Sequence, residues 1–155
     1  MTLFHLSLGS NLEPDKHLRA ALRELRARFG EIQVSSAYET AAVGFDGPPF
    51  WNLAAGLRTD LDMEALNDWL HALEAREGRV RGGARYADRT LDIDVVAVDG
   101  RALERPELRE AFVLVPLGEI APQVLEPQSG KTIGELRSQI ANASLQKLDV
   151  RLEGE

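Results

Sequence analysis

The chain has 155 residues, of which 44% are hydrophobic and 28% charged, as is ordinary for one soluble globular domain. It has no cysteine, which excludes disulfides and thiolate metal sites. The formal net charge of −7 argues against nucleic acid as the main partner. The N-terminus does not have the pattern of a signal peptide, and no apolar run is long enough to span a bilayer. We therefore expect a cytoplasmic protein with a single domain, residues 1–155, that does not bind membranes.

The first elements alternate between strand and helix. An apolar strand over Leu3–Leu8 ends at a turn signal over residues 9–11. A helix is predicted next, because apolar residues recur at a spacing that places them on one helix face: Leu18, Leu22, Leu25 and Phe29. Gly30 is its stop signal. Weak alternation over Ile32–Tyr38 predicts a second strand. The glycine- and proline-rich residues 41–50 predict a loop long enough to bind a ligand.

The second half contains the clearest strand. Residues 52–59 predict a third strand, and Asp62 caps a helix that ends at Gly78. Leu91–Val98 is a β-branched, apolar run interrupted by two aspartates. Further on lie an apolar run over 112–117 and a short helix over 133–140. The mixture of strands and helices predicts one α+β domain with a mainly antiparallel sheet and helices packed on its faces.

A basic island lies between the second helix and this strand. Five of the eighteen basic residues fall within fourteen positions: Arg76, Arg79, Arg81, Arg85 and Arg89. In an acidic protein such an island indicates an anion, and phosphate suits the forked donors of arginine. A solvated basic loop is the alternative explanation.

Asp92 and Asp94 follow the island directly. Residues two apart in a strand point to the same face, so the two carboxylates project together. Mg²⁺ commonly uses one or two carboxylates together with substrate phosphates. A solvent-exposed pair bonded to arginines is the alternative, but the neighbouring arginines favour MgATP and phosphoryl transfer. There is no Walker-type loop.

Three other side chains suggest recognition of a ligand. Glu74 lies near the end of the second helix, where it could accept a ligand hydrogen bond or pair with an arginine. Asn52 offers donors and acceptors that suit a heterocycle, and Phe50 offers a stacking surface. The alternative is a core pair of Phe50 and Trp51 beside an edge asparagine.

Taken together, these motifs resemble the 6-hydroxymethyl-7,8-dihydropterin pyrophosphokinases of folate biosynthesis. The resemblance runs from residue 3 to about 140. The matching segments are Leu8-Gly9-Ser10-Asn11-Leu12, Tyr38-Glu39-Thr40, Phe50-Trp51-Asn52-Leu53-Ala54-Ala55, Gly78-Arg79-Val80-Arg81, Arg89-Thr90-Leu91-Asp92-Ile93-Asp94, Phe112-Val113-Leu114-Val115-Pro116-Leu117 and Glu119-Ile120-Ala121-Pro122.

The resemblance implies a ferredoxin-like α+β sandwich that transfers pyrophosphate from ATP to the pterin hydroxymethyl group and releases AMP. It implies two Mg²⁺ ions on Asp92 and Asp94, and Glu74 in the nucleotide region. Catalytic, ATP-binding arginines would lie in a loop that closes over the reactants: Arg79, Arg81 and Arg89. The implied pterin contacts are Thr40, Ala41, Val43, Phe50, Asn52 and Phe112, with the two phenylalanines stacking on the ring.

The sequence departs from the family pattern between Val98 and Phe112. Members usually carry a Pro-His pair and then an arginine that contact the nucleotide phosphates; here Arg105 and Arg109 are the nearest basic residues. Tyr86 stands where the family more often has tryptophan. The rival interpretations are a paralogue acting on a related pterin, a non-catalytic pterin- or nucleotide-binding protein and, more distantly, an RNA-binding module. We expect a monomer or weak homodimer.

Overall fold

The computed structural model describes residues 1–40, 48–78, 90–140, 145–148 and 152. Within these ranges the strands are β1 (Thr2–Ser10), β2 (Gln33–Val34), β3 (Tyr38–Thr40), β4 (Phe50–Thr59), β5 (Asp92–Val98), β6 (Arg101–Ala102), β7 (Leu125–Glu126), β8 (Lys131–Thr132) and β9 (Leu145–Lys147). They form one sheet in the order β8-β7-β6-β5-β1-β4-β3-β9, with β2 also paired to β4. All pairs are antiparallel except β6 with β7. The predicted mainly antiparallel sheet is confirmed.

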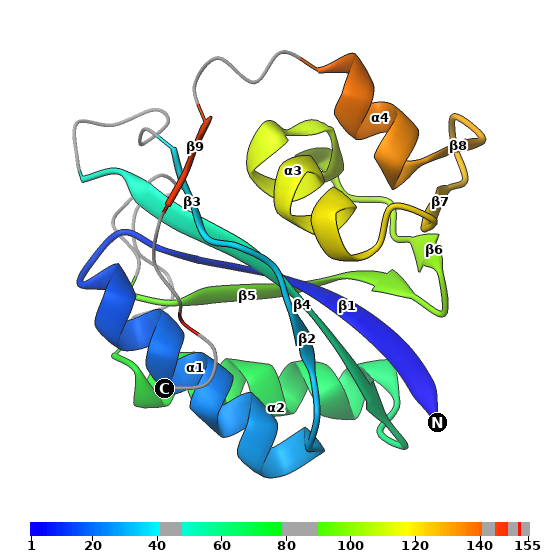
Figure 1. Ribbon diagram of the computed structural model, residues 1–155. Coiled ribbons are helices and arrows are strands. Elements are labelled where there is room, and N and C mark those ends of the chain that lie inside the picture. The colour runs from blue at the N-terminus through cyan, green and yellow to red at the C-terminus, as the bar shows by residue number, and fades with distance from the viewer. Residues whose placement is uncertain (41–47, 79–89, 141–144, 149–151, 153–155) are drawn as a thin grey trace.

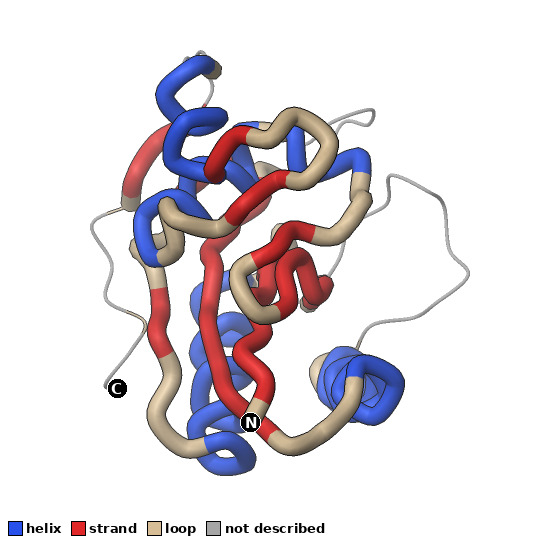
Figure 2. The backbone as a smooth tube through the Cα atoms, turned by 90° about the vertical axis from the view of Figure 1, so that its right-hand side faces the viewer, coloured by secondary structure: helices blue, strands red, loops and turns tan. Residues whose placement is uncertain are grey.

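The helices cover both faces of this sheet (Figure 1). They are α1 (Pro14–Phe29), α2 (Met63–Arg76), α3 (Ala111–Ile120) and α4 (Ile133–Gln139), with a 3₁₀ helix, η1 (Pro106–Arg109), before α3. Helices α1 and α2 lie against one face, and α3 and α4 lie on the other. Figure 2 looks almost along α2 and shows strands between it and the upper helices. The predicted α+β class is confirmed.

Helix ends follow the sequence signals. The Asp62 carboxylate accepts a 2.8 Å hydrogen bond from the Ala65 backbone N–H and so begins α2. Gly30, with a φ of 80°, ends α1 and donates its N–H to the Arg26 carbonyl. Gly78, with a φ of 91°, follows α2 in the left-handed region that glycine tolerates. The predicted caps are therefore confirmed.

Two apolar clusters hold the layers together. The larger joins β1, β4 and β5 to α1 and α2 through leucines on alternate strand positions, such as Leu6, Leu8 and Leu53. The smaller joins the opposite sheet face to α3 and α4, and Val96 and Leu114 are among its buried members. The period-two alternation of the strands creates both clusters, because neighbouring residues point to opposite faces.

The predicted second strand, Ile32–Tyr38, is divided in two. Three residues lie between Val34 and Tyr38, whereas two lie between their β4 partners Ala55 and Asn52, so one residue bulges out of the ladder. The Ser35 hydroxyl stabilises the bulge: it accepts the Ala54 N–H at 2.8 Å and donates to the Ser36 carbonyl at 2.8 Å. Weak sequence alternation over this stretch therefore has a structural cause.

The apolar run 112–117 is helical and forms most of α3. This helix is apolar on all sides because it is buried between the sheet and α4. Pro116 lies inside it and has no N–H to donate to the Phe112 carbonyl one turn earlier. Amphipathic periodicity is therefore absent, so the residue pattern alone did not predict whether this run is a helix or a strand.

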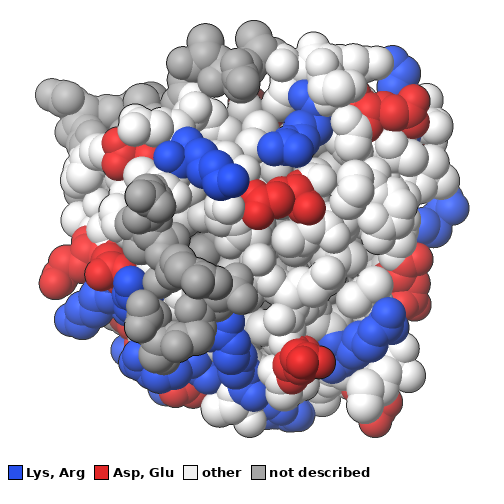
Figure 3. Space-filling model, in the orientation of Figure 1, with Lys and Arg blue, Asp and Glu red and all other residues white. Residues whose placement is uncertain are grey.

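Charged side chains of both signs are interspersed over the face shown in Figure 3. Such a mixed surface differs from the basic stripe that proteins use to follow a nucleic-acid backbone. Among the helices of the described ranges, none combines the length and apolar character needed to cross a bilayer.

We expect Ser35→Ala to lower the free energy of unfolding by about 1–3 kcal/mol, because it removes the acceptor of the buried Ala54 N–H. Urea denaturation provides the measurement. Ser138→Ala is the matched control, since the Ser138 hydroxyl bonds the Glu135 carbonyl on an exposed helix surface, and its cost should stay within about 0.5 kcal/mol. Equal costs for the two variants would contradict a stabilising role for the bulge serine.

Candidate functional site

A single row of residues across the sheet joins the predicted metal and pterin residues. Gly9 of β1 is paired with Asp92 of β5 on one side and with Asn52 of β4 on the other. Directly opposite residues in antiparallel strands present their side chains on the same face. The Asp92 carboxylate and the Asn52 amide therefore flank a position that has no side chain of its own.

Gly9 leaves room that another residue would fill. A Cβ at this position would be 2.8 Å from the Asn52 Oδ1 and 3.8 Å from the Phe50 Cδ1. The first distance is shorter than real Cβ contacts allow. From the sequence alone the turn signal at residues 9–11 carried little weight, yet Gly9 forms the floor between the carboxylates and the amide.

Asp92 and Asp94 lie on the same half-buried face of β5, as predicted, while Ile93 and Val95 are buried on the other face. Burial, together with the negative charge of Asp92, raises the pKa of Asp94 to about 6, although Arg105 opposes the shift. Two carboxylates that repel one another and have lost part of their hydration favour a cation between or beside them.

Arg105, at the start of η1, faces this pair. Its Nη1 lies 3.9 Å from the Asp94 Oδ1 and 3.7 Å from the Glu107 Oε1. Its Nε is buried and has no hydrogen-bond partner among the described residues. The guanidinium therefore lies beside Asp94 and has an N–H donor, at Nε, that no described residue accepts.

Arg109 has a different environment. It pairs with Glu126 at 3.2 Å, and the Glu126 carboxylate also accepts the Ser129 N–H. Of the two basic residues nearest to the absent Pro-His motif, Arg105 is thus the one placed beside the carboxylate pair. Sequence reasoning had no means of choosing between them.

Glu74 is 1% exposed, and its Oε2 accepts a 2.7 Å hydrogen bond from the Ile93 backbone N–H. β6 pairs with β5 only at Ala97 and Val98, so this carboxylate occupies the edge of β5 nearer the aspartates. The expected place of Glu74 in the nucleotide region stays a prediction. The proximity of Glu74 also contributes to the raised pKa of Asp94.

Asn52 and Phe50, two of the predicted pterin residues, lie on the same face of the sheet as Asp92. Asn52 is buried, and its Nδ2 has no hydrogen-bond partner within the described ranges. An unpartnered buried amide is costly unless a ligand completes its bonding. Trp51 instead packs into the larger core on the opposite face, so a core pair of Phe50 and Trp51 is excluded.

Three further contacts shape the same region. Thr40, the last residue of β3, is paired with Phe50. The Asn11 Nδ2 donates a 3.2 Å hydrogen bond to the Pro48 carbonyl, which fixes the chain just before Phe50. Phe112, the second residue of α3, packs against the smaller core, on the same side of the sheet as Asn52. Asn11 therefore has a role that the sequence did not reveal.

Several predicted site residues lie outside the described residues: Ala41, Val43, Arg79, Arg81 and Arg89. The residues that flank the arginine-rich segment lie close together, because a Cβ on Gly78 would be 4.0 Å from the Thr90 Cγ2. Thr90 precedes the strand of the aspartates by two residues. Arg76, the first of the basic island, pairs with Glu24 at 3.5 Å and lies over the Trp69 ring.

The donor set at Asp92 and Asp94 fits Mg²⁺. Both ligands are hard carboxylate oxygens, and no group of three or more His, Cys, Asp or Glu suited to a metal occurs within the described part of the chain. Mg²⁺ accepts such sparse protein ligation when substrate phosphates and water complete its octahedron. The pair is therefore suited to a cation that arrives with a polyphosphate.

Residues 5–122 match the family model of the 7,8-dihydro-6-hydroxymethylpterin-pyrophosphokinases (HPPK). The chain belongs to this family. Its relatives include 2-amino-4-hydroxy-6-hydroxymethyldihydropteridine pyrophosphokinases from Synechocystis, 37% identical over 87% of this chain and 74% of the relative, and from Haemophilus influenzae, 33% identical over 96% and 99%. HPPK enzymes use MgATP and transfer pyrophosphate to the hydroxymethyl group of the dihydropterin in folate biosynthesis.

Solved structures support the fold. The chain matches a crystal structure of HPPK-DHPS in complex with substrates with a TM-score of 0.73 at 12% identity, covering 97% of this chain and 49% of that one. Wild-type Plasmodium falciparum HPPK-DHPS matches with a TM-score of 0.70 at 12% identity, covering 89% and 44%. This chain spans about half the length of those chains. The predicted ferredoxin-like fold is confirmed.

We expect Asp94→Asn to raise the stability of the metal-free protein at pH 7.5 by about 1 kcal/mol. The folded pKa of Asp94, about 6, lies above its ordinary 3.8, so ionisation above pH 6 destabilises the fold. Solvent screens the repulsion, because the side chain is 41% exposed. The advantage should disappear as the pH falls from 6 toward 4, where folded Asp94 is protonated. Urea unfolding of both proteins without magnesium, over this pH range, measures the stability difference. A difference that does not change with pH would contradict this electrostatic account.

Proposed function

We propose that Asp92 and Asp94 hold two Mg²⁺ ions on ATP while Asn52, Phe50 and Phe112 bind the dihydropterin, so that this chain carries out the pyrophosphoryl transfer of its family. The row Asp92–Gly9–Asn52 is the observation that carries the proposal. It sets a metal-binding carboxylate and a heterocycle-binding amide on one sheet face with an open position between them.

The spacing across this row suits the reaction. Two strand spacings separate the backbones of Asp92 and Asn52, which amounts to about 10 Å. A pterin whose ring edge bonds the Asn52 amide can extend its hydroxymethyl group over Gly9 toward a polyphosphate held near the aspartates. Proximity of this kind supplies much of the catalysis in phosphoryl transfer.

The chemistry is a displacement at the β-phosphorus of ATP. The pterin hydroxyl oxygen forms a bond to this phosphorus, the bond from the phosphorus to the oxygen that bridges it to the α-phosphate breaks, and AMP leaves. The hydroxyl proton is released in the same overall reaction. When bound, Mg²⁺ would neutralise the phosphate charge. The residues of the chain position the two substrates, and we include Arg79, Arg81 and Arg89 among them. The support for these arginines is that they lie close to Asp92 and Asp94 in the sequence.

Arg105 completes the nucleotide side in this proposal. Its guanidinium lies 3.9 Å from Asp94 and carries an unpartnered Nε within the described ranges, so it can donate to a phosphate oxygen that arrives with the metal. Arg109 is already paired with the nearly buried Glu126. We therefore assign to Arg105 the phosphate contact that family members obtain from the Pro-His motif.

Incubation with MgATP and 6-hydroxymethyl-7,8-dihydropterin, followed by mass spectrometry, tests the proposal. AMP and the pterin diphosphate should appear together. Asp94→Asn should lower kcat about 100-fold or more while the circular dichroism spectrum is retained. The matched control, Asp15→Asn on exposed α1, should stay within about twofold of the wild type. Pterin binding without AMP in the wild type would instead support a binding protein, and full activity of Asp94→Asn would exclude the metal assignment.

We expect Arg105→Ala to raise the KM for ATP and lower kcat/KM for ATP by about 10–100-fold, because a charge-assisted phosphate contact is lost. Arg109→Ala should leave both constants within about twofold and lower the melting temperature instead, since Glu126 loses its partner. Steady-state kinetics at saturating pterin, with thermal unfolding alongside, provide the comparison. The reverse ranking of the two variants would overturn the assignment of Arg105.

A further inference from the structure

We propose that Glu119 is a positioning residue for the pterin site: it fastens α3 to the segment before β3 and so fixes the distance between Phe112 and the strands that carry Phe50 and Asn52. This inference rests on the proposed pterin site. Glu119 belongs to a sequence motif, Glu119-Ile120-Ala121-Pro122, to which neither the metal pair nor the pterin contacts assign a role.

Both carboxylate oxygens of Glu119 are occupied. Oε1 accepts a 2.7 Å hydrogen bond from the Tyr38 hydroxyl. Oε2 accepts from the Ser36 backbone N–H at 3.0 Å and from the Ser36 hydroxyl at 3.0 Å. Burial alone would raise the pKa of Glu119, but these hydrogen bonds outweigh it and lower the pKa. The carboxylate is therefore ionised at neutral pH and makes three charge-assisted bonds to one short segment.

The bulge between β2 and β3 makes this contact possible. Ser35 keeps the bonds to Ala54 of β4, so Ser36 leaves the ladder and turns its N–H toward α3. Successive N–H groups of an antiparallel strand point alternately to its two edges, and the Ser35 N–H bonds the Ala54 carbonyl of β4. The next N–H, that of Ser36, is therefore not needed for pairing with β4 and anchors the helix instead.

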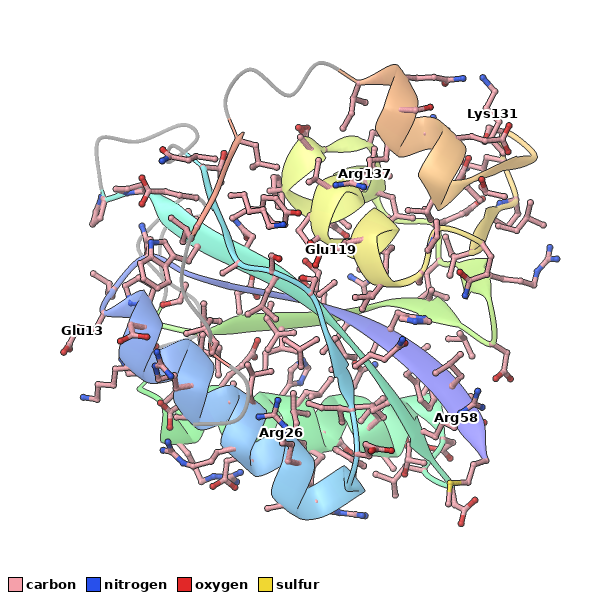
Figure 4. The ribbon with its side chains drawn as sticks, in the orientation of Figure 1. Glu13, Arg26, Arg58, Glu119, Lys131 and Arg137 are labelled. Atoms are coloured by element: carbon pink, nitrogen blue, oxygen red, sulfur yellow. The ribbon has the colours of Figure 1, made fainter. Side chains whose placement is uncertain are left out.

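A second helix supports the clamp formed by Glu119, Ser36 and Tyr38. Arg137 of α4 lies across Gly118, where a Cβ would be 2.7 Å from the Arg137 Cδ (Figure 4). The nearby Arg137 charge lowers the pKa of Tyr38, but burial and the bond to Glu119 outweigh it and raise that pKa to about 12. Tyr38 therefore stays a protonated donor throughout the physiological range.

The clamp acts on the proposed pterin site through the pairing of β3 with β4. Tyr38 is paired with Asn52, and Thr40 is paired with Phe50. Glu119 and Phe112 are seven residues apart on α3, which places them near one face of the helix two turns apart. Because Pro116 removes the helical hydrogen bond to the Phe112 carbonyl, tertiary contacts help to set the position of Phe112. Three hydrogen bonds at Glu119 supply one such contact.

We expect Glu119→Gln to raise the KM for the pterin about 5–20-fold and to leave the KM for ATP within about twofold. The glutamine amide would place N–H donors against donors of Ser36 or Tyr38. Tyr38→Phe, which removes one bond and keeps the ring, should give a smaller rise in the same constant. In the double variant the two effects should be less than additive, because both act on one contact.

Glu135→Gln is the matched control. Glu135 also accepts two hydrogen bonds from one residue, the Thr132 N–H and hydroxyl, but it caps α4 away from β3 and Phe112. It should lower stability without changing the ratio of the two KM values. An independent readout is the phenol titration at 295 nm in a Tyr86→Phe background, which leaves Tyr38 as the only tyrosine. Glu119→Gln should lower the pKa of this phenol.

Equilibrium titration with the fluorescent dihydropterin separates this inference from the proposed function. If the wild type bound pterin but released no AMP, the proposed function would fail. The clamp would still be tested, by the ratio of the pterin affinities of the wild type and Glu119→Gln. Weaker pterin binding in Glu119→Gln and Tyr38→Phe, with unchanged ATP binding, supports the clamp. Unchanged pterin affinity, an equal loss for both substrates, or a loss matched by Glu135→Gln overturns it.

Discussion

The antiparallel register of β1 with both of its neighbours is the constraint on which the site depends. β1 is hydrogen-bonded to β4 from Thr2 to Ser10 and to β5 over most of its length. This double pairing sets Asp92, Gly9 and Asn52 in one row, and no loop has to close for that row to exist. A slip of one residue would turn every side chain of a strand to the other face. The apolar residues of β1, buried below the row, resist such a slip.

The sequence predicted the elements whose patterns are local. The helix caps at Asp62 and Gly30 and the apolar faces of α1 and α2 depend on neighbours within a few positions, so they could be recognised directly. The same holds for Asp92 and Asp94, which need only the two-residue repeat of a strand to share a face. The buried helix α3 has no amphipathic period, so no local pattern could identify it.

The residues that the sequence could not explain act through distant contacts. Glu119 meets Ser36 and Tyr38 more than eighty positions away, and Asn11 meets Pro48. Gly9 leaves an open position in the candidate site because it has no side chain, and this is visible only once the register places Asn52 opposite. The choice between Arg105 and Arg109 likewise depended on which of them the turn into α3 directs toward Asp94. Family resemblance marked several of these segments, but the register and the packing give them physical meaning.

The single extra residue of the bulge also restricts how this chain can change in length. Removing one residue between Val34 and Tyr38 would restore a regular ladder and keep Tyr38 opposite Asn52, but it would abolish the bulge at which the Ser36 N–H bonds Glu119. Removing two would bring Tyr38 opposite Leu53 in a regular ladder and so turn every side chain of β3 to the other face of the sheet. Insertions and deletions in homologous chains should therefore be rarer here than in the surface loops, and the burial of Ser35, Ala37 and Tyr38 adds to this constraint.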